Sequence, residues 1–284
     1  MSKHKIISIL KDLTGHEYIE LTARGNAAIA AALSSLPKNT TVLIPEEGGW
    51  LSYQTMPKKL GLEMREVKCD DAAINVHDLE DTLRKHKPAA LLYQNPGGYF
   101  AEQPMKKIYE VCKKNNCLVI LDVSGSIGTE LCDGKYADIL VCSFGEWKLV
   151  EAGKGGFISC RSAVLWKNIE PKIETIDDEI LFAKILQKLE ELPDRIGKLQ
   201  LARDAVISDL KEYEVVHPND NGFVIVVAFS TDEQRESKKV TSHFELSQRE
   251  SLINYCTKNS LEWTECPRYI RLNRKAISIE IKRI

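Results

Sequence analysis

The sequence predicts an α/β fold, in which a mainly parallel sheet with helices on both faces is followed by a small C-terminal α+β domain. Short apolar and β-branched runs recur after loop signals between about Glu20 and Ser162. Stretches with helical spacing separate several of these runs, and this alternation is typical of parallel strands joined by helical crossovers. Beyond Asp177 the pattern changes to long helical stretches and a few strands, which indicates a second, smaller unit.

The first part of the chain contains the elements of the large sheet. The apolar runs predict strands at Thr41–Ile44, Glu63–Val67, Ala89–Tyr93, Cys117–Leu121, Asp138–Cys142 and Gly156–Cys160. Apolar residues at helical spacing predict helices at Asn26–Leu36, Tyr53–Leu60, His77–His86 and Gln103–Asn115. These elements predict a large ligand-binding domain over residues 1–170.

The second part of the chain begins with a long helical stretch, Asp177–Tyr213, which Pro193 should kink or divide. A strand is expected at Gly222–Ser230, a helix at Leu246–Asn259, and one or two strands within Tyr269–Ile284. We therefore expect connecting helices over residues 171–213 and a small α+β domain over 214–284.

The composition is that of an ordinary globular protein. Its 284 residues are 43% hydrophobic and 28% charged, which excludes collagenous, low-complexity and disordered classes. The 39 basic and 41 acidic residues leave a formal charge of -2, so the balance favours neither nucleic acid nor an anionic membrane as a partner. We therefore expect a small-molecule partner.

The cysteines and histidines indicate neither disulfides nor a metal site. The eight cysteines lie mostly in apolar runs without paired CxxC spacing, which predicts free buried thiols. The six histidines are scattered singly, so we expect no metal. No apolar stretch approaches the roughly eighteen residues of a membrane-spanning helix. These features predict a cytoplasmic, reducing location.

Three motifs fall at strand ends, where open parallel sheets place their ligands. Thr22-Ala-Arg-Gly25-Asn26-Ala27-Ala28 puts a glycine and small residues at the opening of a helix, whose free amides can hold a phosphate. Leu118-Val-Ile-Leu-Asp122 ends an apolar strand with a carboxylate. Ser143-Phe-Gly-Glu-Trp-Lys148 follows another strand, and apolar surroundings would lower the pKa of this lysine and favour imine formation.

In this order, the motifs resemble those of the fold-type I pyridoxal-phosphate enzymes. The segment Ser143-Phe-x-x-x-Lys148-x-x-x-x-Gly-x-Gly-Gly156 is similar to the pattern around the cofactor-binding lysine in their DegT-like aminotransferase branch. The resemblance covers roughly Leu21 to Cys160 and includes Asn95-Pro-Gly-Gly between the helix opening and Asp122. The ordered set is specific, although no single motif is. The short termini make the chain similar to a shortened member of that branch.

The resemblance implies a pyridoxal 5'-phosphate cofactor and a role for each motif. Lys148 would form a Schiff base with the cofactor aldehyde, and Asp122 would keep the ring nitrogen protonated. The helix opening would bind the phosphate, Trp50 would stack on the ring, and Asn95 would contact its phenolic oxygen. The expected cofactor-binding residues are Gly25, Asn26, Ala27, Trp50, Asn95, Asp122, Ser124, Ser143 and Lys148.

Each of these residues also has an ordinary structural interpretation. A strand-ending aspartate often caps a helix, a lysine after a strand is usually solvated, and a loop tryptophan usually packs. The joint occurrence of the motifs in the required strand context favours the cofactor site. Lys154 is the rival of Lys148, and the distance from Ser143 in the sequence favours Lys148.

The expected function is that of an aminotransferase acting on an amino acid or an amino-sugar substrate through Lys148. A lyase of the same fold, catalysing β-elimination, aldol cleavage, decarboxylation or desulfuration, and a non-catalytic homologue are the alternatives. Arg271 is the candidate for binding a substrate carboxylate, with Arg268 and Arg274 as competitors. The resemblance also implies a homodimer, since sites of this class are completed across a two-fold interface.

Overall fold

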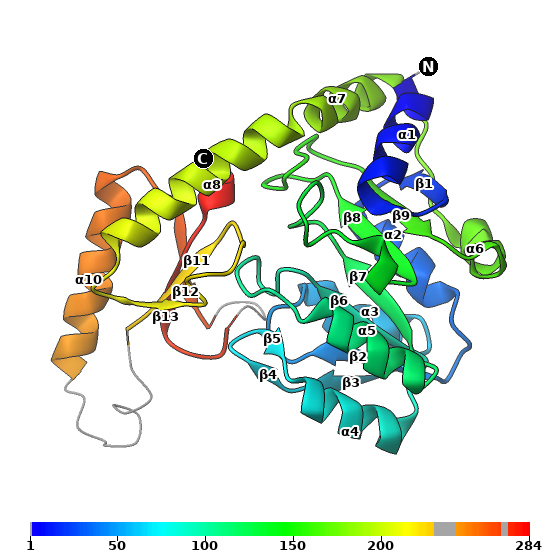
Figure 1. The fold of residues 1–284 in the computed structure, drawn as a ribbon, viewed down its shortest axis with the longest axis horizontal. Helices are drawn as coiled ribbons and strands as arrows, with labels where there is room; N and C mark the ends of the chain where they lie inside the picture. Colours follow the sequence, from blue (N-terminus) through cyan, green and yellow to red (C-terminus); the bar gives the residue numbers. More distant parts are fainter. Residues whose placement is uncertain (1, 230–241, 268–271) are drawn as a thin grey trace.

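The computed structural model describes residues 2–229, 242–267 and 272–284, with side chains described throughout these ranges except at 242–247. Its large domain is built on a seven-stranded sheet with the order β1-β9-β8-β7-β6-β2-β3 (Figure 1). The strands are β1 (Tyr18–Thr22), β2 (Thr41–Pro45), β3 (Glu63–Val67), β6 (Ala90–Gln94), β7 (Leu118–Asp122), β8 (Ile139–Ser143) and β9 (Gly156–Cys160).

The sheet confirms the predicted fold class. Strands β3, β2, β6, β7 and β8 pair in parallel, whereas β9 is antiparallel to both its neighbours, β8 and β1. The six predicted strands are present to within a residue at each end, because each is an apolar or β-branched run bounded by polar turns. Strand β1 is an addition, since its alternation over Tyr18–Thr22 is too short to stand out from the sequence.

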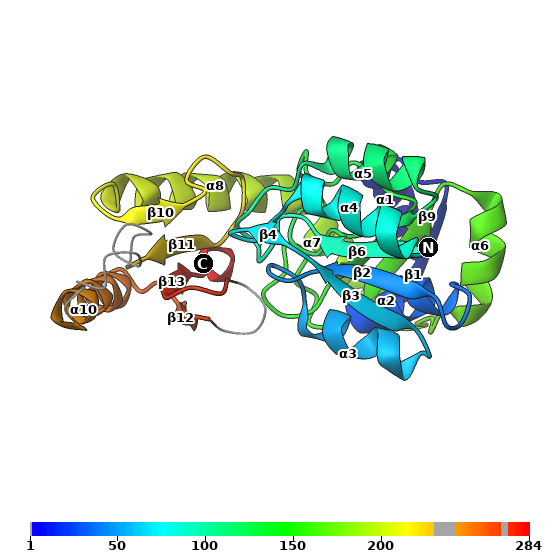
Figure 2. The ribbon, with the colours of Figure 1, turned by 90° about the horizontal axis from the view of Figure 1, so that it is seen from below.

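Helices cover both faces of this sheet (Figure 2). One hydrophobic cluster joins one face to α1 (Ser2–Thr14), α4 (Val76–His86), α5 (Met105–Lys114) and α7 (Glu179–Glu190). A second cluster joins the other face to α2 (Gly25–Ser34), α3 (Leu51–Lys59) and α6 (Ala163–Ile169). The shorter elements of this domain are β4 (Cys69–Asp70), β5 (Ala73–Ile74), η1 (Gly134–Tyr136) and η2 (Glu170–Lys172).

Local signals explain where several of these helices begin. The side chain of Asn75 accepts hydrogen bonds from the backbone amides of His77 and Asp78 at the start of α4. Asp178 caps α7 in the same way, and α8 (Leu192–Asp209) follows with Pro193 in its first turn. Pro193 has no amide hydrogen to donate to a preceding turn, so the predicted division of the long helical stretch is confirmed at this position.

The C-terminal unit contains a four-stranded antiparallel sheet with the order β10-β11-β13-β12. Its elements are β10 (Glu214–Val216), β11 (Ile225–Ala228), α10 (Ser242–Lys258), β12 (Trp263–Cys266), β13 (Ala276–Ile279) and η3 (Ile281–Arg283). One backbone hydrogen bond ties its edge to the large domain, from the amide of Val224 to the carbonyl of Tyr99, and within the unit the amide of Lys282 donates to the carbonyl of Phe223. The last turn of the chain, η3, also contacts the large domain, since Nζ of Lys282 lies 4.8 Å from the centre of the Tyr99 ring.

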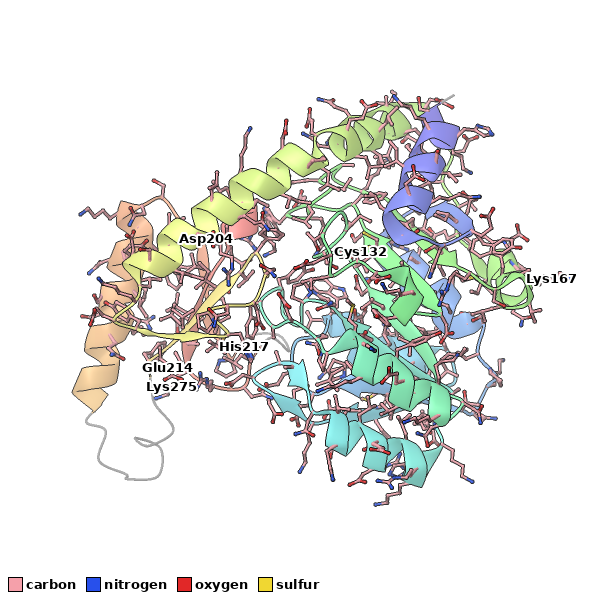
Figure 3. All side chains as sticks on the ribbon, in the orientation of Figure 1. Cys132, Lys167, Asp204, Glu214, His217 and Lys275 are labelled. Atoms are coloured by element: carbon pink, nitrogen blue, oxygen red, sulfur yellow. The ribbon has the colours of Figure 1, made fainter. Side chains whose placement is uncertain are left out.

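The cysteines of the structure are unpaired thiols, and all except Cys69 are buried. Burial raises the pKa of the Cys132 thiol to about 12, so this side chain, labelled in Figure 3, is a neutral packing residue. In the part of the chain that the structure describes, no helix has the length and apolar character required to cross a membrane.

Candidate active site

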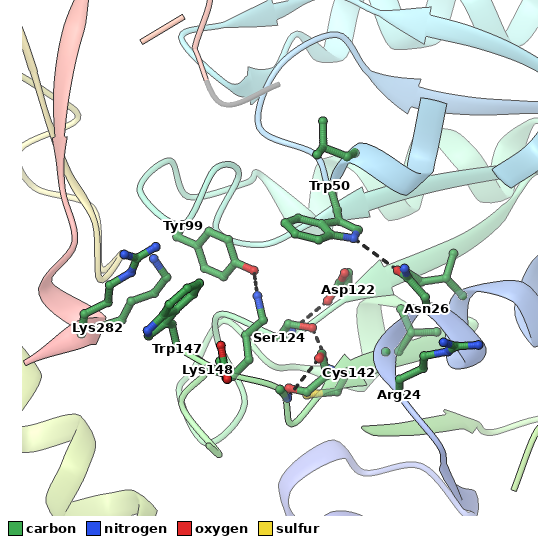
Figure 4. Close-up of a pocket in the computed structure, with 18 residues that line it drawn as sticks. Arg24, Asn26, Trp50, Tyr99, Asp122, Ser124, Cys142, Trp147, Lys148 and Lys282 are labelled. Atoms are coloured by element: carbon green, nitrogen blue, oxygen red, sulfur yellow. Dashed lines mark hydrogen bonds between the residues drawn. The ribbon is translucent and has the colours of Figure 1, made fainter. Parts of the chain in front are cut away.

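A cavity of about 440 Å³ opens at the carboxyl ends of β7 and β8 (Figure 4). This is the edge at which open parallel sheets bind ligands. Residues from the first turn of α2, the start of α3, the loops after β6, β7 and β8, and η3 surround it. The lining residues are Arg24, Gly25, Asn26, Ile29, Trp50, Leu51, Tyr99, Asp122, Ser124, Val141, Cys142, Ser143, Gly145, Glu146, Trp147, Lys148, Lys282 and Arg283.

Gly25 brings the first turn of α2 into contact with the end of β8. A Cβ atom added at Gly25 would lie 2.6 Å from Cβ of Ser143, which is closer than two non-bonded carbon atoms can approach. The glycine therefore allows the amino end of α2 to reach the cavity. Free amides and the positive end of the helix dipole make this a suitable place for an anion such as a phosphate.

Two serines connect the strand ends beside this helix. Oγ of Ser124 accepts a 2.8 Å hydrogen bond from the backbone amide of Ser143. Oγ of Ser143 in turn accepts a 3.2 Å bond from the amide of Gly145. Both serines line the cavity, and a hydroxyl that accepts a hydrogen bond can also donate one.

Asp122, the last residue of β7, is held in a fixed orientation. Its Oδ2 accepts a 2.8 Å hydrogen bond from the phenol of Tyr53, and its Oδ1 accepts a 2.9 Å bond from the amide of Ser124. Only 5% of Asp122 is exposed, yet it lines the cavity. A buried carboxylate with two directed donors is suited to face a cationic group of a ligand.

Lys148 extends into the cavity from the loop after β8. Its Nζ donates a hydrogen bond to the hydroxyl of Tyr99 and lies 5.4 Å from the centre of the Trp50 ring. Burial acts to lower the pKa of Lys148, but Tyr99, Asp122 and Cys142 outweigh it and the pKa is raised. The sequence-based expectation of a lowered pKa is therefore wrong, because the lysine has an acceptor and an acidic neighbour that its apolar flanks do not reveal.

Trp50 lies at the mouth of the cavity, 40% exposed. Its Nε1 donates a 3.2 Å hydrogen bond to Oδ1 of Asn26 (Figure 4). This bond joins the loop before α3 to the first turn of α2. The indole therefore gives the cavity a flat apolar surface next to the helix opening.

Some residues expected at the site lie elsewhere. Ala27 is outside the lining, and its amide donates 3.0 Å to the carbonyl of Arg24. Asn95 is fully buried: its Nδ2 donates to the carbonyl of Leu131 and its Oδ1 accepts from the amide of Gln103. The expected contact with a cofactor oxygen is not available to Asn95 in this arrangement, because its amide group holds two loops together.

Four basic candidates remain, and the structure describes two of them. Lys154 is on the surface, in a 2.9 Å ion pair with Asp178. Arg274 is buried and pairs with Glu214 at 2.8 Å. Arg271 and Arg268 lie outside the described residues.

The structure brings residues to the cavity that the sequence analysis missed. Tyr99 and Trp147 both have positive φ angles, 71° and 58°, and flank the lysine. Lys282 and Arg283 come from the last turn of the chain, and the guanidinium of Arg283 lies 3.9 Å from the centre of the Trp147 ring. Of these four residues, only Tyr99 has a local sequence feature that could have drawn attention to it, namely the Gly97-Gly98 turn that precedes it.

These groups fit pyridoxal phosphate. The cavity combines an amine, a carboxylate, a helix opening with a close-approach glycine, hydroxyl groups and an indole surface. An aldehyde, a basic ring nitrogen, a phosphate and an aromatic ring require this set. Among the described residues, no three His, Cys, Asp or Glu side chains come together as metal ligands.

A mainly parallel seven-stranded sheet with such a cavity at its carboxyl edge defines the class of fold-type I pyridoxal-phosphate enzymes. The profile of the DegT/DnrJ/EryC1/StrS aminotransferase family matches residues 8–174. The chain therefore belongs to this family of pyridoxal-phosphate-dependent aminotransferases. Residues 183–284 match a separate profile, the MJ1341 family C-terminal domain.

Solved structures share this fold at low sequence identity. PseC of Helicobacter pylori, an aminotransferase involved in the biosynthesis of pseudoaminic acid, is 13% identical over 99% of this chain and 85% of its own, with a TM-score of 0.79. Alanine–glyoxylate aminotransferase from Nostoc sp. is 14% identical over 99% and 81% of the two chains, with a TM-score of 0.72. Ureidoglycine–glyoxylate aminotransferase from Bacillus subtilis is 16% identical over 98% and 78%, with a TM-score of 0.69. No curated protein sequence matches the chain.

Proposed function

We propose that Lys148 and Asp122 are the catalytic residues of this aminotransferase and that its substrate is an amino acid or an amino sugar. The observation that carries the proposal is that the lysine, the aspartate and the opening of α2 line one cavity. When bound, pyridoxal phosphate supplies a reactive aldehyde and an electron-withdrawing ring. The chain must hold that ring, keep its nitrogen protonated and move protons at the substrate.

Asp122 would keep the ring nitrogen of the bound cofactor protonated. Its carboxylate is aimed by Tyr53 and by the Ser124 amide, and an opposite charge keeps a proton on a ring nitrogen. The fixed orientation matters because the interaction then needs no rearrangement during the reaction.

Lys148 would move protons at the substrate. Its Nζ can accept a proton from the substrate α-carbon when the amine is neutral and return it when the amine is charged. Nζ is partly buried and held at Tyr99, so it acts away from bulk water.

The phosphate site consists of the amides of Gly25 and Asn26 together with the hydroxyls of Ser124 and Ser143. All four residues line the cavity, and the positive end of α2 adds a favourable field for a dianion. Trp50 offers the apolar surface against which an aromatic ring packs.

Three broader features belong to this proposal. The protein acts as a homodimer, in which a second copy covers the exposed Trp50, Leu51 and Trp147 at the cavity mouth. It works in the cytoplasm, where its free thiols remain reduced. The chain divides into the cofactor domain at 1–170, the connecting helices at 171–213 and the small domain at 214–284.

The direct test is to reduce the protein with borohydride after supplying pyridoxal phosphate and to map the modified peptide. We expect the cofactor mass on Lys148, whereas modification of Lys154 instead would reject the assignment. An amino-donor screen that follows both keto-acid formation and amino-group transfer then separates an aminotransferase from a lyase. Release of keto acid and ammonia without an aminated product would favour the lyase.

A further inference from the structure

Tyr99 lines the cavity and contacts Lys148, but the proposed mechanism does not say what this contact does to the amine. It follows the Gly97-Gly98 turn after β6, has a φ of 71°, and is only 7% exposed. Non-glycine residues with positive φ are uncommon and mark places where the surroundings impose the conformation. The buried ring and the unusual backbone conformation of Tyr99 raise the question of which contacts hold it.

Several elements fix the Tyr99 side chain. A Cβ atom at Gly125, in the loop after β7, would lie 2.6 Å from Cδ1 of Tyr99, so the glycine leaves room for the ring. The backbone carbonyl of Tyr99 accepts a 3.1 Å hydrogen bond from Val224 in the C-terminal unit. Nζ of Lys282, in η3, lies 4.8 Å from the centre of the ring and is paired with the buried Glu280. Both domains thus hold the phenol in place.

The hydroxyl of Tyr99 meets Nζ of Lys148 directly, and Nζ also lies 4.7 Å from the centre of the ring (Figure 4). A phenol can accept a hydrogen bond from an ammonium group and donate one to a neutral amine. The contact can therefore persist in both protonation states of the lysine. An aliphatic or phenylalanine side chain could not provide it.

We propose that Tyr99 is a positioning residue for Lys148: it holds Nζ at the reacting centre and stabilises the protonated amine between proton transfers. The inference rests on the proposed function, since it assigns a partner to the lysine of that site. With Tyr99 in this role, Nζ of Lys148 stays in position for proton transfer during the steps in which it is not covalently bonded to a ligand.

Other charged and titratable groups surround the pair and act on the same proton. Asp122 and Cys142 come from β7 and β8, Tyr53 comes from α3, and Lys282 with Glu280 comes from the C-terminal turn. Burial lowers the pKa of Lys148, and Tyr99 is the foremost of the groups that raise it. Removal of the Tyr99 hydroxyl should therefore lower the pKa of Lys148, because burial continues to lower this pKa and the main group that raises it is gone.

The first experiment measures the protonation of Lys148 without any catalytic readout. Full-length protein freed of cofactor is acetylated with trace acetic anhydride across a pH series, and the Lys148 peptide is quantified by mass spectrometry, with the exposed Lys154 as internal reference. In the parent, Lys148 should titrate above the ordinary lysine range. In Tyr99→Phe its midpoint should move to lower pH, with that of Lys154 unchanged.

The second variant displaces the phenol and keeps its hydroxyl. Gly125→Ala adds a methyl group against the Tyr99 ring, so it should move the Lys148 midpoint in the same direction. Tyr109→Phe is the matched control, because Tyr109 also lies under a lysine, 5.6 Å from Nζ of Lys113, but on α5. This control should leave the Lys148 profile as in the parent.

The loaded enzyme adds a kinetic readout. Tyr99→Phe should lower kcat about tenfold, with little change in KM for the amino donor, and shift the pH–rate profile with the labelling midpoint. An unchanged Lys148 profile in folded Tyr99→Phe, or a parent midpoint below the ordinary lysine range, would overturn the inference. If borohydride fixes no cofactor on Lys148 of the parent, the proposed function fails instead.

Discussion

The phenol of Tyr53 donates a 2.8 Å hydrogen bond to Oδ2 of Asp122, and this bond links α3 to the carboxyl end of β7. Tyr53 is fully buried, and burial together with the Asp122 charge raises its pKa well above the usual range. The phenol is therefore a permanent donor. The packing of α3 on the sheet in this way determines where the carboxylate points.

Replacement of Asp122 tests the importance of its charge. Asp122→Asn keeps the size of the side chain and can still pair with Tyr53, so the fold should persist while turnover falls about 10²- to 10³-fold. Tyr53→Phe removes the donor alone and should cost about 1 kcal/mol of stability with a smaller loss of turnover. Half-reaction kinetics and urea unfolding measure both effects, and parental turnover in Asp122→Asn would rule out the proposed role.

The close approach at Gly25 is tested by adding one methyl group. Gly25→Ala places a Cβ 2.6 Å from Cβ of Ser143, so it should separate α2 from β8, cost roughly 1–3 kcal/mol, and weaken cofactor binding. Gly197→Ala is the control, since nothing lies within 4 Å of a Cβ there and alanine favours the surrounding helix α8. Thermal unfolding and cofactor titration report the difference. Equal behaviour of the two variants would contradict this account.

The two lysines near the glycine-rich turn should differ sharply on substitution. Lys148→Ala removes the only amine that we assign to the reaction and should abolish turnover and cofactor trapping. Lys154→Ala breaks an exposed ion pair with Asp178, which water and salt screen, and should keep near-parental activity. Absorbance of the protein supplied with pyridoxal phosphate distinguishes the two. Loss of the cofactor band in Lys154→Ala alone would reverse the assignment.

His16 predicts a pH dependence of stability. It is 1% exposed, and burial lowers its pKa although contacts with Gly134 and Ser159 oppose the shift. His16 thus binds a proton more readily in the unfolded chain than in the folded one. Its contribution to the free energy of unfolding is therefore complete above about pH 6.5 and is lost as the pH falls below that value. His16→Gln should flatten the loss of unfolding free energy between pH 8 and pH 5.5. The exposed His4→Gln should retain it, and an equally steep loss in His16→Gln would refute the role.

The proposed dimer interface is tested at the cavity mouth. Light scattering should give twice the mass of the chain, and Leu51→Glu should weaken association and activity together, because Leu51 is 39% exposed beside Trp50. Val164→Glu places the same charge on α6, at a residue that is 76% exposed and away from the cavity, and should leave the dimer intact. A fully active monomer would exclude the proposed arrangement.

Local sequence patterns were sufficient for much of the large domain. The run that ends at Asp122 and the run that precedes Ser143 are apolar over a strand's length and end in polar residues, so both the strands and the edge of the sheet at which the cavity opens could be predicted. Gly25 was recognisable because a glycine followed by small residues at the opening of a helix leaves the free amides accessible to a phosphate. Such signals are readable because each depends on neighbours in the chain.

The sequence by itself thus determined the order of the strands along the chain, their polar ends and the presence of a lysine and an aspartate at them. Only the tertiary structure decided that β9 runs antiparallel, that Asn95 turns to Leu131, and that Tyr99 meets Lys148. Tyr99 and Lys148 are 49 positions apart, and the C-terminal turn reaches them from still farther away. Contacts of this kind follow from the packing of whole elements against one another, and the direction of a side chain in a loop has no periodicity that a local pattern could reveal.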